Sequence, residues 1–368
     1  MILVITIAVM LMLGLQYVGM IFHLRYAWKD YSRPERGTCP KVSVLVAARN
    51  EEDDLPRLLQ SFENLDYPQA QIEILIADDQ SEDLTPVLLE SWCAGHANRE
   101  FVTVQSSESG KFHQNGKANA LELLSHRATG DYYFFTDADC AVNPQWIWEG
   151  VSCFTEKVGI VLGVTAVRGQ GVRERLQRLE WWLTLAYVKV ASDLRIPSTG
   201  LGNNMVISRE AYEGAGGFAK LPFTLTEDLE ISRAICAKGY QLVHQVSPFM
   251  LLQTKAEASL QKLLEQRKRW MAGVVTLPWY WQAVLGLQVL YFPALIYLIL
   301  TLPGLGLALA AFKMLAQAVF LLRFSAKAGG RINALEACFF DLYNFPVVLL
   351  TILYYFWPGQ IKWKSRKY

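Results

Sequence analysis

The chain has 368 residues, a formal net charge of +1 and 52% hydrophobic residues. A nearly neutral chain of this length forms one large domain or two, and it offers no basic bulk charge for a nucleic-acid partner. The mean hydropathy of +0.18 is high for a soluble protein. The apolar residues gather at the two ends, which is typical of a membrane protein with a soluble middle.

The spacing of the cysteines and histidines argues against disulfide bonds and zinc sites. The six cysteines include no C-x-x-C pair, and the five histidines form no H-E-x-x-H motif. The first pattern argues against a disulfide framework and a structural zinc site, and the second argues against catalytic zinc. Scattered cysteines are typical of a reducing compartment, so we expect the middle of the chain to be cytoplasmic.

Residues 2–21 are almost entirely apolar, with Gln16 as the only strongly polar residue. A run of about 20 such residues can span a bilayer. A cleaved signal peptide is the alternative, but no basic region precedes the run and no small-x-small site closes it. We therefore expect an uncleaved anchor over residues 1–22. The basic residues behind it place the amino terminus outside and the next domain in the cytoplasm. They are Arg25, Lys29, Arg33, Arg36 and Lys41.

Short apolar runs alternate with helical patterns in the middle of the chain. Buried strands are predicted at 42–48, 72–77, 101–104 and 132–135, with a helical pattern after each of the first three. This alternation predicts an α/β fold with a largely parallel sheet that is covered on both faces. We assign residues 41–273 to this domain.

Polar residues follow three of these strands. They are Asn50 and Glu51, then Asp78 and Asp79, then Asp137 and Asp139. The carboxyl ends of parallel strands share one edge, where ligands bind. Residues two apart in an extended chain point the same way, so Asp137 and Asp139 can converge on Mg²⁺ or Mn²⁺ carrying a phosphate ester. The alternative is an ordinary strand exit with Asp as turn former. Dinucleotide and P-loop motifs are missing from the sequence.

The order of these motifs resembles that of family 2 glycosyltransferases. The resemblance rests on Val42 to Glu52, the Asp78-Asp79 turn, Gly116 to Leu121, Thr136-Asp137-Ala138-Asp139, Gly202 to Val206, Gly216-Gly217-Phe218, Thr226-Glu227-Asp228 and Gln266-Arg267-Lys268-Arg269-Trp270. It implies a GT-A fold with a mixed, mostly parallel sheet, a nucleotide-sugar donor and inversion at the anomeric carbon. The sequence departs from the pattern at Gln80, where many relatives have glycine.

The resemblance also implies roles for individual residues. Asp228 is the expected catalytic base, and Asp137 with Asp139 is expected to hold a divalent cation, Mg²⁺ or Mn²⁺. The expected donor-binding residues are Asn50, Glu51, Asp78, Asp79, Lys117, Asp137, Gln266, Arg269 and Trp270. Those on the acceptor side are Asn203, Asn204 and Glu227. Two alternatives stay open, because acids at 227–228 suit any helix N-terminus and the basic residues 267–269 suit a juxtamembrane cluster.

The carboxy-terminal region, residues 274–358, is nearly all apolar. Spans are predicted at 277–301 and 304–322, and a third apolar run covers 335–357. Basic residues on both sides of the third run favour the cytoplasm, which a single span cannot satisfy. Either polar residues and a proline break this run into a re-entrant hairpin, or the basic tail, residues 359–368, lies outside. The candidate breakers are Asp341, Asn344 and Pro346.

These patterns favour a multi-pass protein of the cell's inner membrane with a cytoplasmic catalytic domain. The resemblance implies that it moves a sugar from UDP-glucose or UDP-N-acetylglucosamine to a hydroxyl of a lipid or lipid-linked acceptor, similar to ceramide glucosyltransferases and their bacterial relatives. The segment 172–194, rich in Leu and Trp, is either a core helix or an interfacial helix that guides a lipid. One alternative is a processive polysaccharide synthase, but the small number of predicted spans leaves little material for a polysaccharide channel. The other alternative is a non-catalytic membrane scaffold.

Overall fold

The computed structural model describes residues 1–33, 39–105, 108, 110–359, 362–363 and 366–367. The chain forms two compact units. The sheet unit comprises residues 30–168 and 191–255, and the helical unit comprises residues 1–29, 169–190 and 256–368. The segment 41–273, assigned from the sequence to one domain, is thus shared between the two units, and its boundaries as a catalytic domain stay a prediction.

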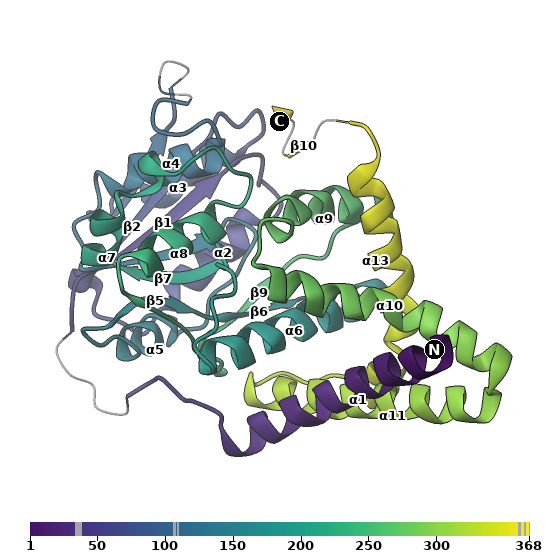
Figure 1. Ribbon diagram of the computed structural model, residues 1–368. Coiled ribbons are helices and arrows are strands. Elements are labelled where there is room, and N and C mark those ends of the chain that lie inside the picture. The colour runs from purple at the N-terminus through teal and green to yellow at the C-terminus, as the bar shows by residue number, and fades with distance from the viewer. Residues whose placement is uncertain (34–38, 106–107, 109, 360–361, 364–365, 368) are drawn as a thin grey trace. The chain divides into compact units, whose positions relative to one another are not determined.

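A seven-stranded sheet forms the centre of the sheet unit, with strand order β3-β2-β1-β4-β7-β5-β8 (Figure 1). The strands are β1 Val42–Ala48, β2 Ile72–Asp78, β3 Arg99–Thr103, β4 Tyr132–Asp137, β5 Val158–Leu162, β7 Asn204–Ser208 and β8 Gln241–His244. Strand β7 pairs antiparallel with both of its neighbours, and every other pair is parallel. A mixed, mostly parallel sheet is therefore confirmed. A separate parallel pair joins β6 (Val164–Val167) to β9 (Leu251–Thr254).

Helices cover the sheet because their apolar residues recur at helical spacing. Helix α2 buries Leu55, Leu58, Leu59 and Phe62, the stripe that the sequence shows, in one cluster with strand residues such as Phe134. The other helices of this unit are α3 Thr85–Cys93, α4 Gly116–Ser125, α5 Trp146–Ser152, α7 Arg209–Ala215 and α8 Glu227–Ala237, while α2 is Leu55–Glu63. Single 3₁₀ turns lie at Gln69–Gln71 and Phe218–Lys220.

The strand register brings distant parts of the chain to one edge of the sheet. Ala48 lies beside Asp78, and Ala47 lies beside Asp137, so β1, β2 and β4 end together. Because β7 runs the other way, it begins at this edge, with Asn204 opposite Thr136. The loop before β7 therefore meets the carboxyl ends of the parallel strands.

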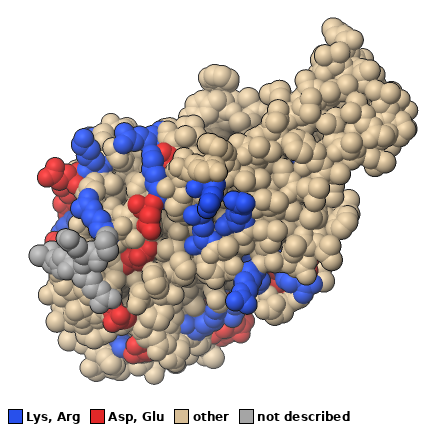
Figure 2. All heavy atoms as spheres, turned by 90° about the horizontal axis from the view of Figure 1, so that it is seen from below, with Lys and Arg blue, Asp and Glu red and all other residues tan. Residues whose placement is uncertain are grey.

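Among the residues that the structure describes, three helices of the helical unit are long and apolar enough to cross a membrane. They are α1 Ile2–Tyr26, α10 Trp279–Thr301 and α11 Pro303–Lys327. Helix α1 packs against α10 and α11 through a buried cluster that includes Met10, Leu13 and Leu298. Figure 1 shows α1 lying along α11, and Figure 2 shows a wide stretch of the visible face with almost no charged side chain. The remaining helices are α6 Val172–Asp193, of which residues 172–190 belong to this unit, α9 Leu260–Val274, α12 Ala334–Phe339 and α13 Asp341–Phe356.

The last apolar run is broken at Phe340 into α12 and α13. Asp341 begins α13, which has 16 residues. A helix of this length is about 24 Å long and is shorter than the hydrocarbon core of about 30 Å. The break expected near Asp341 is therefore present, and of the two or three carboxy-terminal spans expected, two helices have spanning length. The strands β10 (Lys362–Trp363) and β11 (Arg366–Lys367) lie in the tail.

Candidate active site

Lys117 joins three segments of the sheet unit at the shared edge of the sheet. Its Nζ lies 2.6 Å from Oδ1 of Asp137, at the end of β4, and 3.2 Å from Oε1 of Glu227, at the start of α8. Burial would lower the pKa of Lys117, but Asp137 and Glu227 outweigh burial and hold that pKa above its usual value. Lys117 is therefore a fixed positive charge between two predicted site residues. We call Lys117, Asp137, Glu227 and Asp228 the Lys117 cluster.

Asn115 positions Lys117 on its helix and ties the helix to Glu227. Its Oδ1 accepts hydrogen bonds from the backbone N–H groups of Lys117 (3.0 Å) and Ala118 (3.4 Å), so it caps α4. Its Nδ2 donates to Oε2 of Glu227 at 3.1 Å. Sequence reasoning did not select Asn115, although an Asn directly before a helix start is a capping signal.

His113 fixes the loop that carries Asn115. Its Nδ1 accepts the backbone N–H of Asn115 at 3.0 Å, and its Nε2 lies 3.1 Å from the carbonyl oxygen of Pro222. An accepting Nδ1 leaves the proton on Nε2, which then donates to that carbonyl. His113 is thus a buried support for this loop, and no sequence motif pointed to it.

Asp228 is held by two backbone amides beside Lys117. Its Oδ1 accepts the N–H of Leu229 and its Oδ2 accepts the N–H of Gly202, both at 2.9 Å. Burial and then the charge of Glu227 raise the pKa of Asp228, and Lys117 and the Gly202 amide only partly oppose this. The residue as a whole is half-buried. Asp228 is therefore a carboxylate with an increased proton affinity, and two backbone amides fix its orientation.

Two glycines let the loop before β7 approach Asp228. A Cβ on Gly200 would lie 2.1 Å from the carbonyl oxygen of Asp228. A Cβ on Gly202 would lie 3.2 Å from Cβ of Asp228 and 3.3 Å from Nζ of Lys117. The close backbone contact explains why this loop needs glycine at residue 200.

Asp139 lies in a different environment from Asp137. Strand β4 ends at Asp137, and the backbone N–H of Cys140 donates to the Asp137 carbonyl at 3.0 Å, which closes a turn. Oδ1 of Asp139 accepts from Thr254 Oγ1 at 3.3 Å, and its Oδ2 lies 3.9 Å from Nζ of Lys255. The alternation of an extended strand therefore does not place Asp139, and the two carboxylates face different lysines.

Lys255 is a site residue that sequence reasoning missed. Its Nζ lies 3.0 Å from Oε2 of Glu51 and 2.8 Å from Oδ2 of Asp54. Burial alone would lower the pKa of Lys255, but Glu51 and Asp139 raise it above the usual range. A lone lysine after a four-residue strand carries no motif, so only the fold reveals that it meets Glu51 and Asp139.

The sequence predicts Asp137 and Asp139 as ligands of a divalent cation at this edge, and this role stays a prediction. Among the described residues, no group of three or more His, Cys, Asp or Glu is arranged to hold a metal ion. Mg²⁺ is commonly held by one or two carboxylates together with substrate phosphates and water. Two carboxylates without a complete protein cage would fit that mode of binding with substrate phosphate and water as the remaining ligands.

The turns after β1 and β2 are bonded to each other. Oδ1 of Asn50 accepts the N–H of Glu82 at 2.9 Å, and the Arg49 guanidinium donates to the carbonyl of Asp79. Asp78 is buried, and its Oδ1 accepts the N–H of Ser81 at 3.2 Å. Four of the expected donor-binding residues thus lie at the ends of β1 and β2, in two segments that are hydrogen-bonded to each other. They are Asn50, Glu51, Asp78 and Asp79.

Gln80 adopts a φ of 61°. Glycine reaches this left-handed region without a steric penalty, whereas other residues do so at a cost. The conformation explains why glycine is common here in the motif that the sequence resembles, and Gln80 keeps the turn without it.

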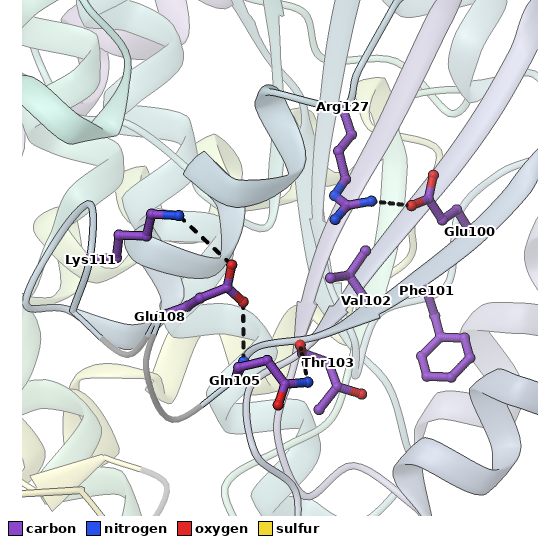
Figure 3. A pocket seen from close by; sticks show the side chains of 8 residues that line it. All are labelled: Glu100, Phe101, Val102, Thr103, Gln105, Glu108, Lys111 and Arg127. Atoms are coloured by element: carbon purple, nitrogen blue, oxygen red, sulfur yellow. Dashed lines mark hydrogen bonds and ion pairs between the residues drawn. The ribbon is translucent and has the colours of Figure 1, made fainter.

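A hollow of about 730 Å³ lies at the end of edge strand β3 (Figure 3). Its lining is mixed in charge, with an Arg127–Glu100 pair at 2.7 Å and a Lys111–Glu108 pair at 3.9 Å. Thr103 in its wall is the register partner of Asp78. None of the predicted site residues lines it.

Asn203 and Asn204 hold the loop before β7 in place. Asn204 is fully buried, and it accepts from Trp146 Nε1 at 3.0 Å and donates to the carbonyls of Val164 (2.9 Å) and Met250 (2.8 Å). Oδ1 of Asn203 accepts from Thr165 Oγ1 at 3.4 Å. We interpret Asn204 as a residue that positions this loop, and its expected contact with the acceptor stays a prediction.

The Q-x-x-R-W residues lie in the helical unit, on α9. Gln266 donates to Oε1 of Glu257 at 2.7 Å, and Trp270 packs edge-to-face on Trp181 with ring centroids 5.3 Å apart. Arg267 binds Glu180 at 2.7 Å. These contacts join α9 to α6, and the donor-binding role of Gln266, Arg269 and Trp270 stays a prediction.

Comparison with known proteins identifies the family. The family model described as "Glycosyl transferase family 21" matches residues 6–368. The chain belongs to this family. The resemblance to glycosyltransferases is confirmed, and the matching family is number 21, whereas the motifs resembled family 2.

Curated relatives of this family member are membrane-lipid and polysaccharide enzymes by name. It is 27% identical over 264 residues to beta-monoglucosyldiacylglycerol synthase of Trichormus variabilis, covering 71% of this chain and 54% of the relative. It is 25% identical over 235 residues to poly-beta-1,6-N-acetyl-D-glucosamine synthase of Staphylococcus aureus, covering 63% of this chain and 54% of the relative. The chain spans about half the length of these relatives.

A solved structure shares the fold. The mannosyltransferase PcManGT from Pyrobaculum calidifontis, in complex with GDP-Man and Mn²⁺, superimposes with a TM-score of 0.57. The two chains are 20% identical, and the match covers 95% of each. This likeness confirms the GT-A fold that the motifs implied.

Proposed function

We propose that this protein is a membrane-bound, inverting glycosyltransferase that moves a sugar from a nucleotide sugar to a hydroxyl group of a lipid. The observation that carries the proposal is the Lys117 cluster, in which one ammonium group binds the end of β4 and the start of α8 beside the oriented carboxylate of Asp228. Membership of glycosyl transferase family 21 supports the reaction class.

Asp228 acts as the general base. The acceptor oxygen bonds to the anomeric carbon as its proton passes to an Asp228 oxygen, and the bond from that carbon to the diphosphate oxygen breaks. A raised pKa brings a carboxylate closer to the operating pH, which favours proton transfer. The amides of Gly202 and Leu229 fix the direction of the carboxylate.

Asp137 and Asp139 would hold a divalent cation, which neutralises charge on the leaving diphosphate when it is bound. PcManGT was solved in complex with GDP-Man and Mn²⁺. Lys117 offsets the negative charge of Asp137 and Glu227, so a diphosphate approaching this edge meets less repulsion. The turns at Asn50 and Asp78 would contact the nucleotide.

A lipid acceptor is favoured by the membrane-spanning candidates within the chain and by the named activity of the Trichormus variabilis relative. Purified protein incubated with labelled UDP-glucose or UDP-N-acetylglucosamine and diacylglycerol or ceramide should yield a lipid-soluble product with one sugar. A long, lipid-free polymer from the same mixture would instead support a polysaccharide synthase, the activity named for the Staphylococcus aureus relative.

The variant Asp228→Asn tests the base. It keeps one of the two acceptor oxygens but cannot take a proton, so we expect kcat to fall by about 10²- to 10⁴-fold with UDP binding retained. Glu230→Gln is the matched control, because Glu230 lies in the same first turn of α8 and pairs with Arg233 instead. Unchanged transfer by Asp228→Asn would exclude this role.

We also propose that α13 does not cross the membrane. Lys268 on α9, which precedes the first carboxy-terminal span, donates to the carbonyls of Trp357 (2.8 Å) and Gly359 (3.2 Å), which follow α13. The end of α13 thus lies at the level of α9. The segment after α11 would lie on this same side, because α10 and α11 form one pair of crossings, and the amino terminus would lie on the other.

Single cysteines in a background without native cysteines test this topology. In inverted vesicles, an impermeant maleimide should label both Arg331→Cys and Pro358→Cys but leave Ile2→Cys unlabelled. Labelling of residues 331 and 358 from opposite sides would show that α13 spans the membrane.

A further inference from the structure

A second hollow, of about 420 Å³, lies within the helical unit between α6 and the segment that joins α11 to α12. Guanidinium groups dominate its lining: Arg175 and Arg178 come from α6, and Arg331 comes from the segment after α11. The other lining residues are Gln170, Leu179, Ile332, Asn333 and Glu336. Three guanidinium groups face one carboxylate, so the hollow carries a formal charge of +2.

The two α6 arginines are held in place by the protein. Nε of Arg175 donates to Oε1 of Glu336 at 2.7 Å, and Nη1 donates to the carbonyl of Gln170. The Arg178 guanidinium donates to the carbonyl of Gly169. Burial, and then the nearby charge of Arg175, lower the pKa of Arg178. The like charges therefore repel each other, and an anion between them would relieve that repulsion.

Packing fixes the wall opposite α6. A Cβ on Gly330 would lie 1.9 Å from the Trp182 indole ring, so the backbone after α11 rests directly on α6. Trp182 also packs edge-to-face on Phe324, with ring centroids 6.1 Å apart. The hollow is therefore formed by packed elements and does not depend on the position of surface side chains alone.

The place of the hollow in the fold indicates which anion it meets. Helix α11 is a candidate span that ends at Lys327, four residues before Arg331. Arginine and lysine at the cytoplasmic end of a span attract anionic lipid headgroups. A guanidinium group also matches phosphate oxygens in a bidentate geometry. The positive charge of the hollow, the geometry of its guanidinium groups and its place near the end of α11 thus all favour a phosphate group at the membrane surface.

We propose that this hollow binds the phosphate of an anionic phospholipid. The site is distinct from the sugar-transfer site, and the proposal does not rest on the proposed reaction. Arg175 and Arg178 contact the phosphate from the wall of the hollow, and the exposed Arg331 contacts it from the rim.

Lipid retention by the full-length protein tests this site. The protein is purified in neutral detergent, mixed with phosphatidylglycerol or phosphatidylcholine, and examined by native mass spectrometry. We expect phosphatidylglycerol to be retained at about one tenth of the concentration that phosphatidylcholine needs. Equal retention of the two lipids overturns the proposal. Displacement of phosphatidylglycerol by millimolar inorganic phosphate also overturns it, because the site would then take free phosphate.

The double variant Arg178→Gln/Arg331→Gln removes two of the three positive charges. Each basic residue near an anionic surface contributes about a fivefold factor, so phosphatidylglycerol affinity should fall about thirtyfold. Arg173→Gln is the matched control on the same helix, because Arg173 pairs with Glu174 at 2.9 Å and does not line the hollow. Undiminished retention by the folded double variant refutes the assignment. If that variant does not fold, the comparison of phosphatidylglycerol with phosphatidylcholine retention by the unchanged protein tests the proposal.

Discussion

Among the lysines that bind carboxylates in this protein, Lys117 and Lys313 lie in different surroundings. In the sheet unit, Lys117 binds Asp137, whose side chain is 36% exposed. In the helical unit, Lys313 on α11 binds Asp341 at 2.5 Å, and the two side chains are 3% and 6% exposed. The first pair is open to a ligand, and the second is closed within the packed helices.

The closed pair has its hydrogen bonds completed by a third side chain. Gln317 accepts from Lys313 at 2.8 Å and donates to the second carboxylate oxygen of Asp341 at 3.0 Å. The ring of Tyr291 lies 4.5 Å from the Lys313 ammonium. A charge among apolar helices is expensive unless it is paired, so this cluster specifies how α11 packs against the start of α13. A lysine–aspartate pair thus stabilises helix packing in the helical unit, whereas we propose that such a pair takes part in catalysis in the sheet unit.

The largest expected effect is on stability, from breaking the closed pair. Asp341→Leu leaves Lys313 without its counter-charge, which should cost about 3–5 kcal/mol and lower the midpoint of thermal unfolding in detergent. The double variant Lys313→Met/Asp341→Leu should recover most of this loss, because no charge is then left unpaired. A double variant as unstable as the single one would show that the pair is not what matters.

Replacing Lys117, which belongs to the exposed pair in the sheet unit, should instead affect activity. Lys117→Met takes away a fixed charge at the transfer site, and we expect kcat/KM to fall by about 10²- to 10³-fold with a much smaller loss of stability than Asp341→Leu. Transfer needs ionised Asp228, and Lys117 lowers the pKa of Asp228. Without Lys117 that pKa rises further, so the acidic limb of the pH–rate profile should move to higher pH.

Lys238→Met is the control for this variant, because Lys238 is exposed at the opposite end of α8 from Asp228. It should leave both rate and profile unchanged. An acidic limb that stays in place in Lys117→Met would mean that the ammonium does not act on the base.

The smallest expected effect on activity and stability comes from changing the backbone beside the Lys117 cluster. Gly200→Ala would place a methyl group 2.1 Å from the carbonyl oxygen of Asp228, so the loop must shift, at about 1–3 kcal/mol, and the amide of Gly202 with it. We expect reduced transfer and a modestly lower unfolding midpoint. Gly214→Ala, on α7, meets nothing within 4 Å and should leave both unchanged. Equal behaviour of the two variants would argue against a tight loop.

The sequence predicts those parts of the fold that depend on local pattern. Continuous apolar runs predict the strands at 42–48 and 132–135, and the structure has them at Val42–Ala48 and Tyr132–Asp137. Helical spacing predicts the stripe Leu55, Leu58, Leu59 and Phe62, which the structure confirms. The reversed direction of β7 was not predictable from spacing, because it depends on which strands become neighbours.

For the site, sequence reasoning identified residues that carry motifs and missed those that do not. Lys117 and Asp228 were selected through the resemblance, and the structure places Lys117 between Asp137 and Glu227. Lys255 meets Glu51 across about 200 positions of the chain, and nothing in its local sequence signals this. The turn at Cys140 likewise replaced the extended geometry that was expected for Asp139.

The bond between Asn115 and Glu227 joins residues 112 positions apart in the chain. Contacts of such high sequence separation form slowly, because a long loop must close before the contact is made. In refolding, the strands β1, β2 and β4 can pair before β7 inserts beside β4 and brings the Gly200–Gly202 loop to the same edge. Recovery of sugar transfer should therefore lag behind recovery of sheet structure, and catalytic activity would report the last step in assembling the sheet unit.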